Sequence, residues 1–249
     1  MKKILIIGIG AGDPDFVTMQ AAKALNTVDV FFILEKGAAK DGMMELRREI
    51  CRRYAKDRPY RVVEAPSPSR DPRPADYAAC VDDLNRAKQD MFGKMIADGL
   101  GEGQTGAILA WGDPSLYDST IRNVESIAAR QGLSYEVIPG ITAVQVLTAR
   151  HRITLNTIGR PVEITTGRRL AEGWPAGVDT VVVMLDGEET YRRFTDQDID
   201  IYWGAYLGTP DEILIAGRLA DVADEIHRVR TAQRSAHGWI MDTYLMRRR

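Results

Sequence analysis

The sequence of 249 residues contains few cysteines and few histidines. Its two cysteines, Cys51 and Cys80, are too few for a disulfide framework, and three histidines add little to a metal-ligand set. Long apolar runs are also missing, because the longest, residues 4–9 and 28–34, fall far short of the ~18 residues of a membrane helix. We therefore expect no metal site and no membrane segment.

A charge bias is likewise missing. The 33 basic and 35 acidic residues give a net charge of −2, so the chain has no bulk positive field for nonspecific binding of nucleic acid. With 45% hydrophobic and 27% charged residues, the composition is that of a globular protein. The start, Lys2-Lys3 before an apolar run, imitates a secretory signal, but glycines follow at once without a cleavage-site pattern. We expect a cytoplasmic enzyme.

The order of apolar patterns predicts two α/β domains. Residues 3–9 form a continuous apolar run that ends in glycines, which is typical of a strand buried on both faces of a parallel sheet. A helix at 19–25 and a second buried strand then complete a strand–helix–strand unit. Apolar residues at three- and four-residue spacing predict a long helix over 76–99. Strand candidates, among them residues 239–245, dominate the later part beside helix candidates such as 188–194. This change places the domains at residues 1–150 and 151–249.

A glycine-rich turn, Gly8-Ile9-Gly10-Ala11-Gly12-Asp13, follows the first strand. Glycines there let backbone N–H groups approach a ligand closely. A dinucleotide fingerprint needs a further glycine where Asp13 stands, and Pro14 follows, so nicotinamide binding is disfavoured although Glu35 ends the second strand. A tight turn without a ligand also explains the glycines, and a nicotinamide-dependent oxidoreductase stays as an alternative of a different class.

Two further turns follow later strands. They are Trp111-Gly112-Asp113-Pro114-Ser115-Leu116-Tyr117 and Pro139-Gly140-Ile141-Thr142-Ala143. Ligands of open α/β sheets bind at the carboxyl ends of the strands. Either turn alone is common, but two turns from neighbouring strands can enclose a small polar molecule through backbone groups. Together they predict a binding site.

Charged candidates lie elsewhere in the chain. Loops at residues 69–73 and 167–169 carry arginines that can pair with carboxylates, although a solvated loop arginine is the commoner case. His151 and Asp186, at the ends of predicted elements, are candidates for acid–base work, but a lone histidine is more often an ordinary polar residue. The sequence has no nucleophile elbow, metalloprotease or P-loop pattern.

The order of these motifs resembles the tetrapyrrole methylase family. The resemblance covers nearly the whole chain and is carried by Gly8-x-Gly10-x-Gly12-Asp13-Pro14, Gly112-Asp113-Pro114-Ser115-Leu116-Tyr117, Pro139-Gly140-Ile141-Thr142-Ala143 and Leu207-Gly208-Thr209-Pro210-Asp211-Glu212. It implies two α/β domains with a trough between them for cofactor and substrate, and usually a homodimer. It also implies methyl transfer from S-adenosylmethionine, which leaves as S-adenosylhomocysteine, to a small-molecule tetrapyrrole.

The resemblance also implies roles for single residues. The methyl donor would be held by Trp111, Gly112, Asp113, Pro114, Leu116, Tyr117, Thr142, Ala143, Met184, Leu207, Gly208, His237 and Gly238. The N-terminal glycine turn would face the macrocycle, which makes Gly10 and Asp13 substrate-side residues. Family members often have Ser-Trp before Pro-Asp-Glu, whereas this chain has Gly208-Thr209.

Further runs resemble a subgroup of the family that methylates a precorrin at ring carbon 1 with loss of acetate, in aerobic cobalamin biosynthesis. They include Leu34-Glu35-Lys36-Gly37, His151-Arg152-Ile153-Thr154-Leu155-Asn156 and Val183-Met184-Leu185-Asp186-Gly187. Acetate loss needs a base or a stabilised oxyanion, and Asp13 is our candidate for the base. Arg70, Arg168 and Arg169 are expected to hold substrate carboxylates. Alternatives are another tetrapyrrole methylase, a diphthine-synthase-like protein methyltransferase, and a regulatory module that binds the donor without turnover.

Overall fold

A computed structural model describes residues 1–35, 41–68 and 77–249. The chain forms two compact units: the first contains Met1–Gly10 and Pro14–Ile141, and the second contains Ala11–Asp13 and Thr142–Arg249. The division between the units therefore falls at 141/142 rather than at the expected 150/151. The reason is that helix α5 (Ala143–His151) packs on the strands of the second unit.

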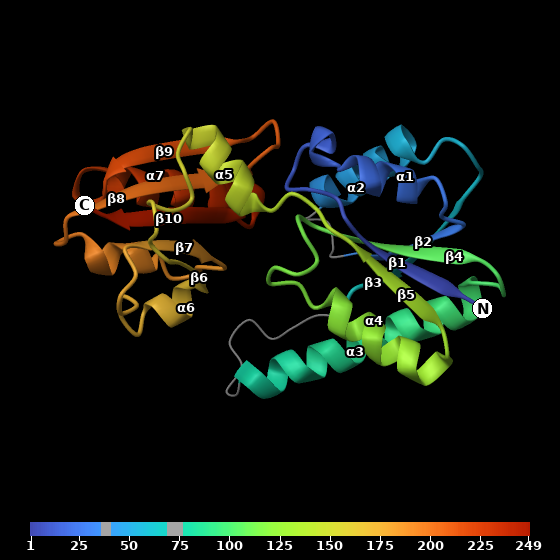
Figure 1. The fold of residues 1–249 in the computed structure, drawn as a ribbon. Coiled ribbons are helices and arrows are strands. Elements are labelled where there is room, and N and C mark those ends of the chain that lie inside the picture. The colour runs from blue at the N-terminus through green and yellow to red at the C-terminus, as the bar shows by residue number, and fades with distance from the viewer. Residues whose placement is uncertain (36–40, 69–76) are drawn as a thin grey trace. The chain divides into compact units, whose positions relative to one another are not determined.

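The first unit is a parallel sheet between two layers of helices (Figure 1). Its strands lie in the order β3-β2-β4-β1-β5, with bounds β1 (Lys3–Gly8), β2 (Val30–Glu35), β3 (Arg61–Pro66), β4 (Thr105–Ala110) and β5 (Ser134–Ile138). One face carries α1 (Met19–Leu25) and α2 (Asp41–Tyr54), after the short turn η1 (Pro14–Phe16). The other face carries α3 (Tyr77–Gly99) and α4 (Thr120–Gln131).

Both faces of this sheet are apolar, which explains the continuous apolar run of the first strand. Ile4 and Ile6 belong to the core under α3 and α4, whereas Leu5 and Ile7 belong to the core under α1 and α2. Alternation along a strand sends successive side chains to opposite faces, so a strand covered on both sides must be apolar throughout. The predicted parallel sheet and the long helix ending at Gly99 are confirmed.

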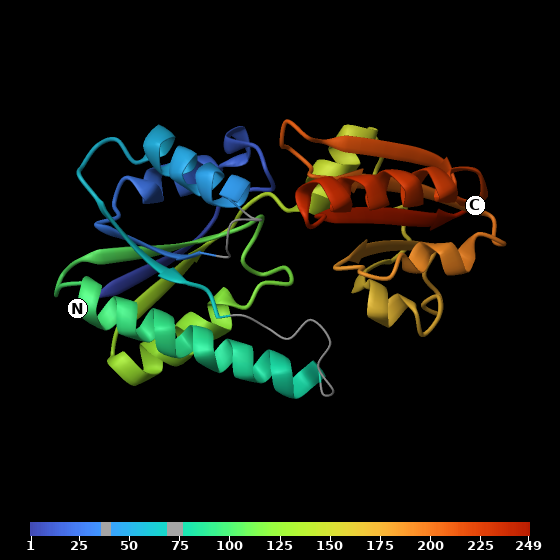
Figure 2. The ribbon, with the colours of Figure 1, turned by 180° about the vertical axis from the view of Figure 1, so that it is seen from behind.

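The second unit is built on a mixed sheet of order β6-β7-β10-β8-β9. Its strands are β6 (Val162–Thr166), β7 (Thr180–Met184), β8 (Ile199–Ala205), β9 (Ile213–Arg218) and β10 (Asp242–Arg248), of which only β6 and β7 pair in parallel. Helix α7 (Leu219–His237) covers one face (Figure 2), and α5 packs on the other through Leu147 at Gly204. The short helices are α6 (Gly167–Leu170) and η3 (Thr190–Phe194).

Some bounds in the second unit differ from the predicted ones. The helix predicted at 188–194 is the 3-10 turn η3, and the strand predicted at 239–245 begins only at Asp242. The reason for the later start is that α7 continues to His237 and is capped by Gly238 in the left-handed region, at φ 72°.

In the parts of the chain that the structure describes, no helix combines the length and apolar character that crossing a bilayer requires.

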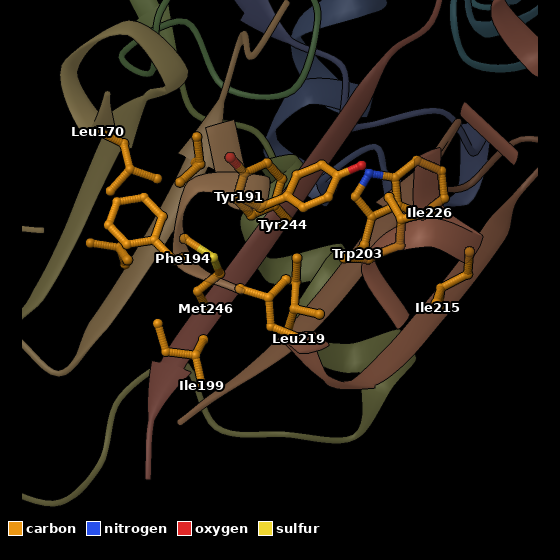
Figure 3. Close-up of a cluster of buried hydrophobic side chains, with 14 of the residues drawn as sticks. Leu170, Tyr191, Phe194, Ile199, Trp203, Ile215, Leu219, Ile226, Tyr244 and Met246 are labelled. Carbon is orange, nitrogen blue, oxygen red and sulfur yellow. The ribbon is translucent and has the colours of Figure 1, made fainter. Parts of the chain in front are cut away.

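The core of the second unit contains the aromatic rings of Tyr191, Trp203 and Tyr244 (Figure 3). A buried charged pair, Arg230 and Asp242, contacts this core through Trp203. Arg230 and Asp242 have side chains only 5% and 7% exposed, and Arg230 Nε lies 3.0 Å from Asp242 Oδ2. The indole of Trp203 donates a second hydrogen bond to the same oxygen, at 3.0 Å. Arg230 also donates to the backbone oxygen of Asp186 at 2.6 Å. Because both side chains are almost wholly shielded from water, this pair depends on the partners that the fold supplies.

Candidate functional site

Three turns of the first unit meet at the carboxyl ends of the adjacent strands β4, β1 and β5. Gly10 and Gly112 form an antiparallel bridge, in which Gly10 N donates to Gly112 O at 3.2 Å and Gly112 N donates to Gly10 O at 2.8 Å. A Cβ atom on Gly140 would lie 2.0 Å from Gly112 O, and one on Gly8 would lie 2.6 Å from Gly140 N. The glycines are therefore required by backbone contact, and the turns present backbone groups rather than side chains.

Asp113 ties two of these turns together. Its Oδ2 accepts a hydrogen bond from Gly140 N at 2.8 Å, and its Oδ1 accepts bonds from Ser115 N, at 2.8 Å, and from the Ser115 hydroxyl. Burial alone would raise the pKa of Asp113, but the hydrogen bonds from Ser115 and Gly140 outweigh it and hold the pKa below its usual value. Asp113 is thus an ionised clamp between the turn after β4 and the turn after β5.

Asp113→Asn is expected to destabilise the protein at neutral pH by about 1–3 kcal/mol, because the amide NH2 would face one of the donating N–H groups. The pKa of Asp113 is depressed in the folded state, so its contribution is present above the ordinary value of about 3.9 and is lost as the pH falls through the folded-state pKa. Urea unfolding of both proteins at pH 7 and pH 3 tests this. A stability difference that does not narrow at pH 3 contradicts the assignment.

The remaining residues of the turn after β4 differ in exposure. Pro114 is buried, whereas Trp111 and Leu116 are half-buried. Trp111 packs against the core under α1 and α2. These side chains support the turn from the sheet side and leave its backbone in place for a ligand.

Backbone strain marks three of the loops that the resemblance selected. Tyr117, Leu185 and Tyr206 have positive φ angles of 50°, 55° and 49°, which non-glycine residues rarely adopt. Leu185 directly follows Met184, the half-buried last residue of β7, and Tyr206 directly precedes Leu207. Tyr117 and Leu185 are also exposed, at 45% and 68%. Strained conformations cluster at ligand-binding loops, and neither Leu185 nor Tyr206 is among the donor-binding residues that the resemblance implies.

The Leu207–Gly208 loop is held by contacts inside the second unit. Gly208 N donates to Glu212 Oε2 at 2.7 Å, and Arg150 pairs with Glu212 at 2.9 Å. Gly12, which belongs to the second unit, lies so close that a Cβ atom there would be 2.1 Å from Leu207 O. Glu212 therefore positions this loop, a role that its place in a family motif did not reveal.

The other second-unit candidates lie at helix ends. Thr142 caps α5 by accepting a hydrogen bond from Val144 N at 3.1 Å, and Ala143 is half-buried in the first turn. The exposed His237 ends α7, with its ring 5.3 Å from that of Tyr206, and Gly238 is the left-handed cap.

Among the substrate-side candidates, Gly10 and Asp13 lie on the turn after β1, as expected, whereas the described arginines lie in a different kind of element from the one predicted. Asp13 is half-buried, and Gly10 adopts φ 80°. Arg168 and Arg169 are exposed but lie on the one-turn helix α6, not on a loop as expected, because Thr166 caps that turn. Arg169 also pairs with Glu172. Arg70 and the loop around it lie outside the described residues.

The two acid–base candidates are engaged in the structure of the second unit. His151 Nε2 lies 3.0 Å from Trp203 O, and burial lowers the pKa of His151 although Trp203 O and Glu212 oppose the shift. Asp186 accepts hydrogen bonds from Thr190 N at 2.7 Å and from the Tyr244 hydroxyl at 2.6 Å. These contacts favour structural roles for both side chains.

A parallel sheet whose glycine turns converge at one edge, followed by a unit with a mixed sheet, defines an α/β protein with exposed backbone groups at the edge where such sheets bind ligands. The model of the tetrapyrrole (corrin/porphyrin) methylases matches residues 3–223. The chain therefore belongs to the tetrapyrrole methylase family, as its motifs predicted.

Individual relatives agree with this membership. Precorrin-6A synthase [deacetylating] from Sinorhizobium sp is 52% identical over 250 residues, which cover 100% of this chain and 96% of the relative. The crystal structure of a cobalamin synthesis related protein (CobF) from Corynebacterium diphtheriae matches with a TM-score of 0.83 and 35% identity, over 99% of this chain and 98% of that one. Uroporphyrin-III C-methyl transferase from Thermus thermophilus, solved with S-adenosyl homocysteine, shares the fold at a TM-score of 0.58 and 18% identity. The match covers 98% of this chain and 91% of that one.

Proposed function

We propose that this protein is a methyltransferase that uses S-adenosylmethionine to convert precorrin-5 into precorrin-6A, with methylation at ring carbon 1 and release of acetate. The observation that carries the proposal is the 52% identity to a precorrin-6A synthase, which extends over the whole chain. A match over both units covers the loops of the site as well as the sheets that position them. The reaction belongs to aerobic cobalamin biosynthesis.

The turns of the first unit fit a nucleoside-containing donor. Gly112 and Gly140 bring backbone amides and carbonyls together without side chains, which suits the polar edges of such a ligand. We assign donor binding to the residues named from the resemblance: Trp111, Gly112, Asp113, Pro114, Leu116, Tyr117, Thr142, Ala143, Met184, Leu207, Gly208, His237 and Gly238. For Asp113 and Thr142 the role is to hold the backbone, because their side-chain oxygens are already engaged.

The methyl-transfer step itself requires little chemical participation by side chains. The donor, when bound, supplies a methyl group on a positively charged sulfur. The chain's task is to hold the acceptor carbon in line with that group and to exclude water, so positioning supplies most of the rate. No side-chain nucleophile is required for this step.

Acetate release requires a water molecule to attack an acyl carbon. The carbon–carbon bond to the macrocycle then breaks, its electron pair stays on the macrocycle, and the acyl group leaves as acetic acid. We assign Asp13 as the base that takes the proton from this water. It is half-buried on the glycine turn that carries Gly10, our second substrate-side residue. A positioned carboxylate of this kind contributes ~10²–10⁴-fold to such a step.

Asp13→Asn is therefore expected to slow acetate release at least about a hundredfold and to leave the affinity for S-adenosylhomocysteine within about twofold. Acetate and methylated product are quantified separately in single-turnover reactions. Asp15→Asn is the matched control, since Asp15 lies two residues away and pairs with Arg53 at 2.7 Å in the first unit. Acetate release at the wild-type rate in Asp13→Asn would rule out this role.

A precorrin carries many acidic side chains, and we assign Arg70, Arg168 and Arg169 to hold some of them. Alanine at all three positions is expected to weaken precorrin binding at low salt, where charge pairing is least screened. Unchanged substrate affinity at low salt would contradict this assignment.

The proposed reaction is tested by incubating the purified protein with precorrin-5 and methyl-labelled donor. We expect one labelled methyl group per macrocycle and one acetate released. Methylation of uroporphyrinogen III or of a protein substrate, with no reaction on precorrin-5, would point instead to another member of the family. We also propose that the protein works as a homodimer in the cytoplasm, and analytical ultracentrifugation tests the dimer.

A further inference from the structure

A cavity opens in the first unit where β2 and β4 diverge. These two strands pair only at Val30 with Gly106 and at Phe31 with Ala107. Beyond that point β2 continues beside β3, and β4 continues beside β1. From β2 the chain leaves through α2 toward β3, whereas from β4 it leaves through α4 toward the opposite edge of the sheet (Figure 1). Divergence of this kind creates a crevice at the carboxyl ends of the strands, where α/β proteins bind ligands.

The cavity has a volume of about 120 Å³ and a mixed lining. Phe32, Phe92 and Ile108 give it apolar walls. Its polar lining comes from helices on both faces of the sheet, from the chain after β3 and from the segment before α4: Arg47, Ser67, Lys88, Asp118, Ser119, Thr120 and Asn123. Among the described residues of the lining, two cations and one carboxylate give an excess of positive charge.

Arg47 is the unusual member of this lining. Arg47 is half-buried, and its Nη1 makes a weak contact with the thioether sulfur of Met44 at 4.0 Å. Among the described residues, no carboxylate lies within ion-pair distance of it. Its neighbours on α2 differ, because Arg48 pairs with Glu64 at 3.1 Å and Arg52 pairs with Glu45 at 2.5 Å. The positively charged side chain of Arg47 thus lines the cavity, whereas Arg48 and Arg52 pair with carboxylates at the surface.

The electrostatics of the cavity favour an incoming anion. Burial lowers the pKa of Arg47, and the charge of Asp118 opposes that shift. Arginine nevertheless keeps its proton, so burial leaves a charge that gains from a counter-ion. Asp118 is partly engaged, since its Oδ1 accepts from Thr120 N at 2.6 Å at the start of α4. Asn123 is also engaged, because its amide donates to Ser119 Oγ at 3.3 Å and accepts from Gln89 at 3.2 Å.

We propose that this cavity binds a small aliphatic carboxylate, held by the guanidinium of Arg47. A planar guanidinium matches a carboxylate with two parallel hydrogen bonds, and the apolar walls accommodate a short alkyl group. The volume is several times the about 30 Å³ that a water molecule occupies, which leaves room for a two- or three-carbon acid. The source of the carboxylate rests on the proposed function: it is either the released acetate or an acidic side chain of the precorrin.

The binding test uses the full-length protein, without donor or precorrin, titrated with ¹³C-labelled acetate or propionate and followed by NMR. Wild-type protein is expected to bind both acids, and to bind the neutral analogue acetamide at least tenfold more weakly. Arg47→Gln is expected to weaken acetate binding at least tenfold. Arg47→Lys is expected to have an affinity between those of the wild type and Arg47→Gln, because lysine keeps the positive charge but lacks the planar guanidinium that forms two parallel hydrogen bonds. Arg52→Gln, on the same helix with surface partners, serves as the matched control and is expected to bind acetate as the wild type does.

Several results would overturn the proposal. They are absence of acetate and propionate binding to the wild type, equal binding of acetamide, or unchanged binding in both Arg47 variants. Titration of the same samples with S-adenosylhomocysteine measures donor binding separately from acetate binding, and a variant that binds the donor as the wild type does is folded. The carboxylate site and the proposed methyltransferase function can therefore fail independently.

Turnover then identifies the source of the carboxylate. If a precorrin side chain occupies the cavity, Arg47→Gln raises the KM for precorrin about tenfold, and added acetate competes with precorrin. If released acetate occupies it, the KM is unchanged and product inhibition by acetate is lost in Arg47→Gln. Either pattern supports the site, whereas kinetics identical to those of the wild type in the presence and absence of acetate contradict it.

Discussion

Gly140→Ala is expected to lower the affinity for S-adenosylhomocysteine about tenfold or more, equivalent to about 1.4 kcal/mol, and to lower the melting temperature. The added Cβ would lie 2.0 Å from Gly112 O and 2.8 Å from the carbonyl carbon of Gly8, both rigid backbone atoms. The turn after β5 must therefore move away from the turns after β4 and β1. Overpacking of this kind costs about 1–3 kcal/mol, and it opens the backbone that we assign to the donor.

Calorimetric titration and thermal unfolding measure both effects. The matched control is Gly187→Ala, because a Cβ on Gly187 meets nothing within 4 Å. That control is expected to leave donor affinity unchanged and to change stability by less than about 0.5 kcal/mol. If Gly140→Ala binds S-adenosylhomocysteine as tightly as the wild type, the convergent turns are not the donor site.

Arg230→Met is expected to destabilise the second unit by about 3–5 kcal/mol, the usual cost of removing one partner from a buried ion pair. Asp242 would keep its indole hydrogen bond from Trp203 but lose its only buried cation in the described structure. Burial already raises the pKa of Asp242, and Arg230 works against that rise. Without Arg230 the pKa of Asp242 rises further, so the variant should lose less stability at low pH, where the carboxyl is protonated.

Urea unfolding followed by tryptophan fluorescence measures the loss, with Arg192→Met as the control. Arg192 pairs with Asp224 at 3.0 Å, but that carboxylate is 92% exposed, so its loss should cost no more than about 1 kcal/mol. Equal effects of the two substitutions would show that the buried pair contributes no more than a surface pair.

Local sequence patterns predicted much of the first unit. The apolar run of β1 and the long apolar periodicity of α3 each depend on side chains close together in the chain, and both elements are where they were expected. The glycine turns were also found in advance, because Gly10 and Gly112 stand directly beyond strand ends. Element type and the positions of turns are local properties, which explains this success.

Other features depend on contacts between distant parts of the chain. No local pattern showed that Asp113 would bind Gly140 N, or that Glu212 would hold Gly208 N. The same holds for the cavity at Arg47, which exists because β2 and β4 separate. The turns themselves were thus predictable from local patterns, whereas the contacts by which Asp113 and Glu212 hold these turns were not.

The most direct test of the methyltransferase assignment is calorimetric titration of the purified protein with S-adenosylhomocysteine, with NADH as the control ligand under the same conditions. Our account predicts micromolar binding of S-adenosylhomocysteine and no binding of NADH. Binding of NADH without binding of S-adenosylhomocysteine would contradict it, and would mean that the turn from Gly8 to Asp13 serves a nicotinamide cofactor.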